Sequence, residues 1–161
     1  MTEAGFRFLY REDRGRISRA AWWGGTVPLA VLVAAATALW VFVRPYASHD
    51  LATQPFIDVA TILAYLYLAA YAFGLILAAV CYYNVSAKRF RDRGRPGRLA
   101  AVLPLAAFLA GALDWFIPQS FGEVPAWAGT VALVTLVAIA IWNVVDLGFA
   151  PTAVGTTRIV P

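Results

Sequence analysis

The chain has 161 residues, of which 61% are hydrophobic and 14% charged, with a formal net charge of +4 and a mean hydropathy of +0.70. Typical soluble proteins carry about a quarter charged residues, so this composition excludes an ordinary solvated surface and predicts a single membrane domain. The positive charge lies beside apolar runs, which favours an anionic membrane leaflet over nucleic acid as the partner.

Four apolar runs are long enough to cross a bilayer, which takes roughly 20 residues. They cover residues 20–43, 61–85, 99–117 and 126–145. The first run is longer than the apolar core of a signal peptide, about 7–15 residues, so we expect it to be retained. The sequence therefore predicts an all-α fold, a bundle of four transmembrane helices.

Three regions outside the membrane complete the predicted organisation. A basic N-terminal segment, residues 1–19, precedes the four-span domain of residues 20–145. That domain contains a basic loop, residues 86–98, and a tail of residues 146–161 follows it. Glycine and proline at positions 94, 96 and 97 are typical of a turn into the third span.

The basic residues mark one side of the predicted bundle. Of the 13 lysines and arginines, only Arg44 lies in a connection between the first and second or the third and fourth spans. Basic residues gather on the cytoplasmic side of membrane proteins. We therefore expect both termini and the loop 86–98 in the cytoplasm, and the connections 44–60 and 118–125 outside.

The tryptophans give a second indication of where the spans end. All of them fall near an end of a predicted span, where an amphipathic indole suits the membrane interface. We predict that they are interfacial anchors: Trp22, Trp23, Trp40, Trp115, Trp127 and Trp142.

Two basic segments carry a resemblance to a known family. The first reads Gly15-Arg16-Ile17-Ser18-Arg19-Ala20-Ala21-Trp22-Trp23, and the second reads Lys88-Arg89-Phe90-Arg91-Asp92-Arg93-Gly94-Arg95-Pro96-Gly97-Arg98. The chain resembles the YhaH-like bacterial inner-membrane family, domain-of-unknown-function family 805. That family shows a Gly-Arg-x-Ser-Arg-x-x-aromatic-Trp pattern and an Arg-Arg-Leu-His-Asp-x-Gly-Arg-Ser-Gly-Trp loop.

The match in the second segment is incomplete. Arg91 stands in the histidine place, Pro96 in the serine place and Arg98 in the tryptophan place. The missing histidine argues against a proton-transfer role of that loop. The resemblance implies a multi-pass protein of the bacterial plasma membrane without a defined biochemical activity.

The basic face predicts a site for an anion. In the expected topology the first and third helices begin in the cytoplasm, and helix N-termini attract negative charge. Arginines flank both ends, and a phospholipid headgroup is the nearest anion. We predict an anionic-lipid site at Arg16, Arg19, Arg89, Arg95 and Arg98. In the alternative interpretation these arginines only set orientation.

Polar residues on the same side predict a structural network. Asp92 and Asp146 could pair with arginines and lock the loop to the bundle, with Asn84 and Asn143 beside them. Simple charge compensation is the alternative.

No feature of the sequence predicts a cofactor, a metal site or nucleic-acid binding. His49 is the only histidine, and a metal site needs several ligands. Asp114 lies close enough to the end of its span to reach the interface. Known catalytic motifs are missing, so we expect no enzyme.

These observations favour a non-enzymatic scaffold or envelope factor whose cationic face binds anionic phospholipid or an acidic partner. The chain could also form a homo-oligomer or bind another membrane protein. Two other functions stay open: a small oligomeric transporter or channel, and a membrane enzyme acting on a phosphate-bearing lipid. A transporter would need a polar cavity, and an enzyme would need a carboxylate beside the bound phosphate.

Overall fold

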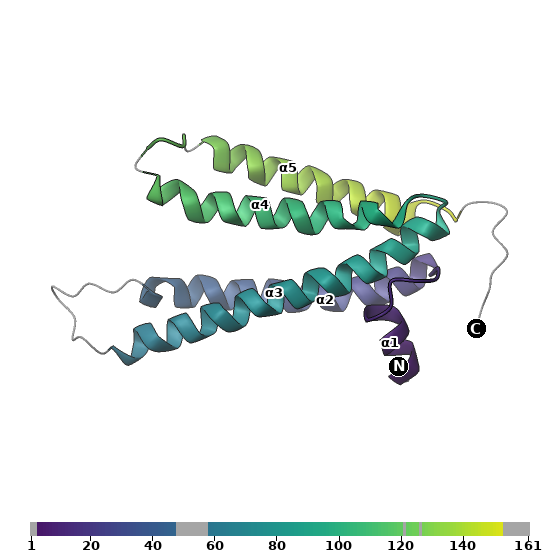
Figure 1. The fold of residues 1–161 in the computed structure, drawn as a ribbon, viewed down its shortest axis with the longest axis horizontal. Coiled ribbons are helices and arrows are strands. Elements are labelled where there is room, and N and C mark those ends of the chain that lie inside the picture. Colours follow the sequence, from purple (N-terminus) through teal and green to yellow (C-terminus); the bar gives the residue numbers. More distant parts are fainter. Residues whose placement is uncertain (1–2, 48–57, 121, 126, 153–161) are drawn as a thin grey trace. The chain divides into compact units, whose positions relative to one another are not determined.

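The structure, a computed structural model, describes residues 3–47, 58–120, 122–125 and 127–152. Over these residues it is helical, without strands (Figure 1). The four long helices are α2 (Arg19–Val43), α3 (Val59–Asp92), α4 (Val102–Phe116) and α5 (Trp127–Asn143). They coincide with the four predicted apolar runs, which confirms the all-α prediction with four membrane-spanning helices.

Shorter helical pieces join or precede the long helices. An eight-residue helix, α1 (Glu3–Tyr10), begins the described chain. Turns of 3-10 helix cover Arg44–Ala47 (η1), Gly97–Ala101 (η2) and Ile117–Gln119 (η3), and a π-helix, η4 (Val144–Phe149), continues α5.

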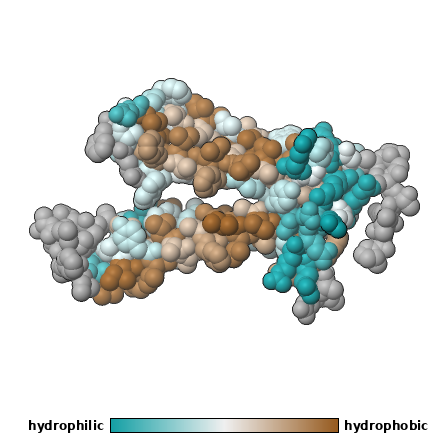
Figure 2. All heavy atoms as spheres, in the orientation of Figure 1, coloured by the Kyte–Doolittle hydropathy of each residue, from teal (hydrophilic) through white to brown (hydrophobic). Residues whose placement is uncertain are grey.

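The sides of the long helices are apolar and exposed. Each long helical segment has a window of mean hydropathy between 1.8 and 2.2, of which only 6 to 11% is buried. Figure 2 shows hydrophobic side chains along the helices and hydrophilic ones gathered around α1. Water does not tolerate so much exposed apolar surface, whereas lipid does. The chain is therefore a multi-pass membrane protein.

The chain divides into two compact units. In Thr26–Val80, the paired parts of α2 and α3 are joined by the Tyr67 hydroxyl, which donates to the carbonyl of Ala36 at 2.6 Å. A hydrogen bond of 2.9 Å joins Thr37 and Tyr71 in the same unit. The other unit holds Met1–Gly25 and Cys81–Pro161. There α4 and α5 lie side by side and antiparallel (Figure 1).

The structure differs from the sequence prediction at the basic segments. The segment 86–98, predicted as a loop, is helical through Asp92, and the N-terminal segment contains α1. With 34 residues, α3 is roughly 51 Å long, whereas the hydrocarbon core of a bilayer is about 30 Å thick. One end of α3 therefore lies outside the hydrocarbon. His49 and the tail residues 153–161 lie outside the described residues.

Candidate functional site: the buried basic end of α3

The last turns of α3 are the best-buried part of the chain. The side chains of Val85, Ser86, Lys88, Arg89 and Phe90 are all 0% exposed. Two of these five are cations, which are almost never fully buried unless their charges are paired or hydrogen-bonded. We call residues 84–95 the α3 hub.

The hub is helical up to Asp92 because no glycine or proline lies between Asn84 and Arg93. At Gly94 the backbone turns left-handed, with φ of 70°. The amide of Gly94 donates to the carbonyl of Arg91 at 3.0 Å, and the amide of Arg95 donates to the carbonyl of Phe90 at 2.9 Å. This is the Schellman pattern that satisfies the last carbonyls of a helix. Cations in that last turn are further stabilised by the helix dipole.

One face of the hub holds the end of α1. The amide of Asn84 donates to the carbonyl of Tyr10 at 2.7 Å. One turn later, the ammonium of Lys88 donates to the carbonyl of Leu9 at 2.9 Å and to that of Phe8, whose ring centroid lies 4.7 Å away. The end of a helix leaves carbonyls without internal partners. Asn84 and Lys88 supply those partners for α1.

The same face continues to Arg91, which fixes the chain after α1. Its guanidinium donates to the backbone carbonyl of Asp13 and lies 3.7 Å from the Asp13 carboxylate. Positions 84, 88 and 91 recur at helical spacing and so lie on one side of α3. At Gly97 an added Cβ would lie 3.0 Å from Arg91 Nε, so glycine leaves room for this arginine.

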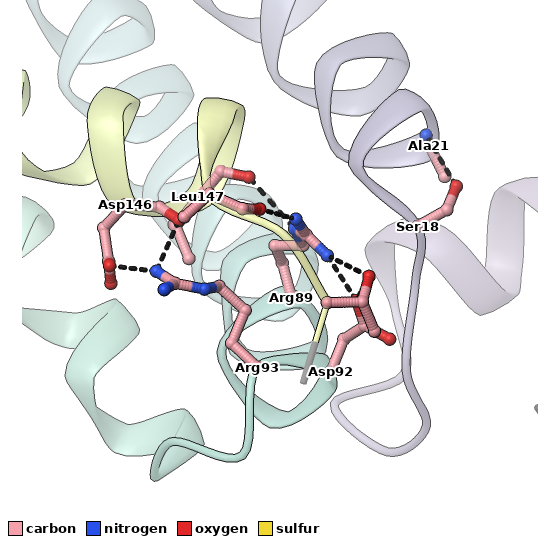
Figure 3. A network of polar contacts seen from close by, with 9 residues as sticks. Ser18, Ala21, Arg89, Asp92, Arg93, Asp146 and Leu147 are labelled. Carbon is pink, nitrogen blue, oxygen red and sulfur yellow. Dashed lines mark hydrogen bonds and ion pairs between the residues drawn. The ribbon is translucent and has the colours of Figure 1, made fainter. Parts of the chain in front are cut away.

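A second face of the hub holds the chain after α5. Arg89 Nε donates to the carbonyl of Leu147 at 3.0 Å, and Nη2 donates to that of Ala150 at 2.7 Å (Figure 3). Arg89 Nη1 pairs with Asp92, and the hydroxyl of Thr152 donates to the same carboxylate at 3.0 Å. The Arg89 charge is thus buried but satisfied on every nitrogen.

Asp146 joins the π-helix to the end of the hub. Its carboxylate pairs with Arg93, and its backbone carbonyl accepts from Arg93 at 2.6 Å (Figure 3). The same carboxylate lies 2.9 Å from Arg95 Nη1. The Asp146 side chain is 9% exposed, and those of Arg93 and Arg95 are 15% and 44% exposed. The Arg93 pair is therefore the buried one, and solvent weakens the Arg95 pair.

Tryptophans at the start of α2 pack against the hub and the π-helix. Trp22 Nε1 donates to the Ser86 hydroxyl at 3.2 Å, and Trp23 Nε1 donates to the carbonyl of Gly148 at 3.1 Å. An added Cβ at Gly148 would lie 2.7 Å from Trp23 Cζ2. Only glycine allows this approach between η4 and α2.

Comparison with known protein families identifies one family that matches most of the chain. The family model described as "Protein of unknown function (DUF805)" matches residues 10–158. The chain belongs to the DUF805 family. No curated protein and no solved structure matches it. The matched region of this DUF805 chain includes the hub and all four long helices, whereas α1 precedes it except for Tyr10.

The structure divides the arginines predicted to bind anionic lipid. The guanidinium of Arg89 is buried, and its nitrogens bond to Asp92 and to backbone carbonyls. Arg95 shares the Asp146 carboxylate. The other three are exposed and form no hydrogen bond or ion pair with the described residues: Arg16, Arg19 and Arg98.

The residues predicted to form a structural network lie in separate contacts. Asp92 and Asp146 each pair with an arginine of the hub. Asn84 contacts α1 instead, and Asn143 accepts from the Tyr82 hydroxyl at 3.0 Å. Among the described residues, neither asparagine bonds to an arginine or an aspartate.

The predicted interfacial tryptophans have different surroundings. Trp115 and Trp127 are 65% and 66% exposed, beside the turn between α4 and α5. The Trp22 side chain is 2% exposed and belongs to the core. Trp40 stacks with tyrosines of α3, and Trp142 lies 5.9 Å from the Phe90 ring.

Sequence reasoning missed α1 and the role of Lys88. The apolar residues Phe6, Leu9 and Tyr10 have helical spacing, a signal that could have indicated a short amphipathic helix. Burial raises the pKa of Tyr10 above its ordinary value, so its phenol remains a donor. That phenol donates to the carbonyl of Gly25 at 3.0 Å.

Proposed function

We propose that this DUF805 chain is a non-enzymatic scaffold of the bacterial plasma membrane that binds anionic phospholipid through Arg16, Arg19 and Arg98. The proposal rests on one observation, the difference between cations with internal partners and cations that are exposed. Hub cations are occupied by internal partners, whereas these three arginines are exposed and lack partners among the described residues.

Electrostatics favour an anion beside these arginines. Arg16, Arg19 and Arg98 are exposed, so a phosphate can reach their guanidinium groups. The guanidinium group binds phosphate through paired hydrogen bonds. Each cation near an anionic surface contributes about 1 kcal/mol, so three contribute on the order of 3 kcal/mol.

The helix start beside Arg19 supports the same ligand. Arg19 is the first residue of α2, and the Ser18 hydroxyl accepts from the amide of Ala21 at 3.3 Å. Ser18 therefore caps α2, as its position before an apolar run suggests. The other first amides of the helix point toward the same end as the arginine and add positive potential there.

The proposed orientation places this end in the cytoplasm, where anionic lipid is accessible to it. Both termini would then be cytoplasmic, as the distribution of basic residues predicts. A reporter fused after Pro161 tests this: a green fluorescent protein should fluoresce and a periplasmic phosphatase should be inactive. The opposite pattern would overturn the orientation.

Native mass spectrometry of protein released from nanodiscs tests the lipid site. The triple variant Arg16→Gln, Arg19→Gln, Arg98→Gln should retain less phosphatidylglycerol than the unsubstituted chain. A matched triple in the N-terminal segment, Arg7→Gln, Arg11→Gln, Arg14→Gln, removes the same charge and should retain more than the first. Equal retention by both triples would contradict the lipid site and would favour an acidic partner protein instead.

A further inference from the structure

The short helix α1 is held by hydrogen bonds at defined positions along the long helices α2 and α3. It runs across the ends of α2 and α3 instead of along them (Figure 1). The Tyr10 phenol reaches the carbonyl of Gly25, which is six residues into α2 and thus about 9 Å along its axis. On the other side, Asn84 and Lys88 hold the α1 carbonyls.

One side of α1 is buried and the apolar surface continues past it. Leu9 and Tyr10 are buried, and an added Cβ at Gly25 would lie 3.2 Å from both Leu9 Cδ2 and Val85 Cγ1. Phe6 lies one turn before Tyr10, with ring centroids 4.9 Å apart, yet Phe6 is 52% exposed. Packing within the described chain therefore leaves half of this ring uncovered.

Along the axis of α2, Gly25 lies close to the exposed apolar part of that helix. The exposed apolar side chains Val27 and Val31 follow Gly25 by two and six residues, which is about 3 and 9 Å along the helix. These side chains need lipid around them. The α1 contacts with Gly25 are thus within about one helical turn of the hydrocarbon.

We infer that α1 is an interfacial helix that lies in the membrane plane and inserts Phe6 at the boundary between headgroups and acyl chains. Lys88 and Asn84 couple this lipid-bound helix to α3. The lipid site proposed at Arg16, Arg19 and Arg98 does not include α1. The inference for α1 therefore requires only that the long helices cross a bilayer.

Spin labelling in the full chain tests this depth. Cys81 is the only cysteine, so Cys81→Ala gives a background for single labels. Labels are placed by Phe6→Cys, by Glu12→Cys as an aqueous reference and by Leu32→Cys as a lipid reference. The protein is reconstituted in vesicles of equal parts phosphatidylcholine and phosphatidylglycerol. The collision rates of each label with oxygen and with a water-soluble nickel chelate are then compared.

The ratio of oxygen to nickel collisions should be several-fold higher at position 6 than at position 12 and approach that at position 32. A ratio at position 6 equal to that at position 12 would overturn the inference, because α1 would then lie in water. The helical circular dichroism of the Phe6→Cys protein, compared with its parent, checks that the fold is kept. Failure here would leave the lipid-site proposal intact, since that is read from retained phosphatidylglycerol.

Discussion

The substitution Arg89→Lys separates two roles that a basic residue at this position can have. Orientation by positive charge counts lysine and arginine alike, so a residue that only orients the chain tolerates the change. Arg89, however, uses three nitrogens to reach two backbone carbonyls and a carboxylate. A lysine ammonium is a single nitrogen on a flexible stem and cannot reproduce that planar fork.

The size of the effect follows from the contacts that are lost. A lysine that keeps the Asp92 pair leaves the carbonyls of Leu147 and Ala150 without their charged donors. Arg89 is 0% exposed, so water does not replace those donors without rearrangement. Hydrogen bonds involving a charged group contribute about 1.5–3 kcal/mol each, so we expect Arg89→Lys to lower the free energy of unfolding by about 3 kcal/mol.

Thermal unfolding in detergent micelles, followed by tryptophan fluorescence, measures this loss. Trp23 is bonded to Gly148, next to the Arg89 contact at Leu147, and so reports on the affected region. Arg98→Lys is the matched control, because Arg98 is exposed and forms no bond with the described residues. Arg89→Lys should lower Tm by several degrees and Arg98→Lys should not. Equal Tm values for the two variants would refute the reasoning.

Three further substitutions test the contacts around the hub, two by the same unfolding measurement and one by hydrogen exchange. Gly148→Ala should lower the free energy of unfolding by about 1–3 kcal/mol, because its Cβ would lie 2.7 Å from Trp23. Gly24→Ala is the control and should be neutral or stabilising, because its Cβ would meet nothing within 4 Å. A similar loss of stability in both variants would contradict this. Asp146→Ala removes the carboxylate that pairs with the mostly buried Arg93 and should lower the free energy of unfolding by about 3 kcal/mol. An unchanged Tm would show that this ion pair does not stabilise the fold. Lys88→Met should increase amide hydrogen exchange in α1 selectively, since the lysine supplies donors to its last carbonyls; unchanged exchange there would exclude that role.

The positions of the four long helices could be predicted from the sequence, because an apolar run of span length has few other solutions in a membrane protein. The end of α3 could not be predicted in the same way. Residues 86–92 are rich in charge and resemble a loop, yet they lack a helix-breaking residue. Gly94 is the actual helix stop, and its left-handed backbone is the reason.

The candidate site was only partly predictable for a related reason. Composition indicates that arginines gather at one end, but it does not show which of them will be buried. Arg89 is buried because η4 and the chain after it wrap around α3, a contact between residues about 60 apart in the sequence. Lys88 is buried by α1, a helix too short to be recognised by its length.

The central claim is that buried hub cations hold the fold while the exposed arginines bind lipid. Measuring Tm and retained phosphatidylglycerol side by side tests it most directly, in Arg89→Lys and in the triple variant of Arg16, Arg19 and Arg98 to glutamine. We predict a crossed result: Arg89→Lys lowers Tm and the folded protein keeps its lipid, whereas the triple variant loses lipid and keeps its Tm. If Tm and lipid retention fell together in both variants, the division between the two groups of cations would be contradicted.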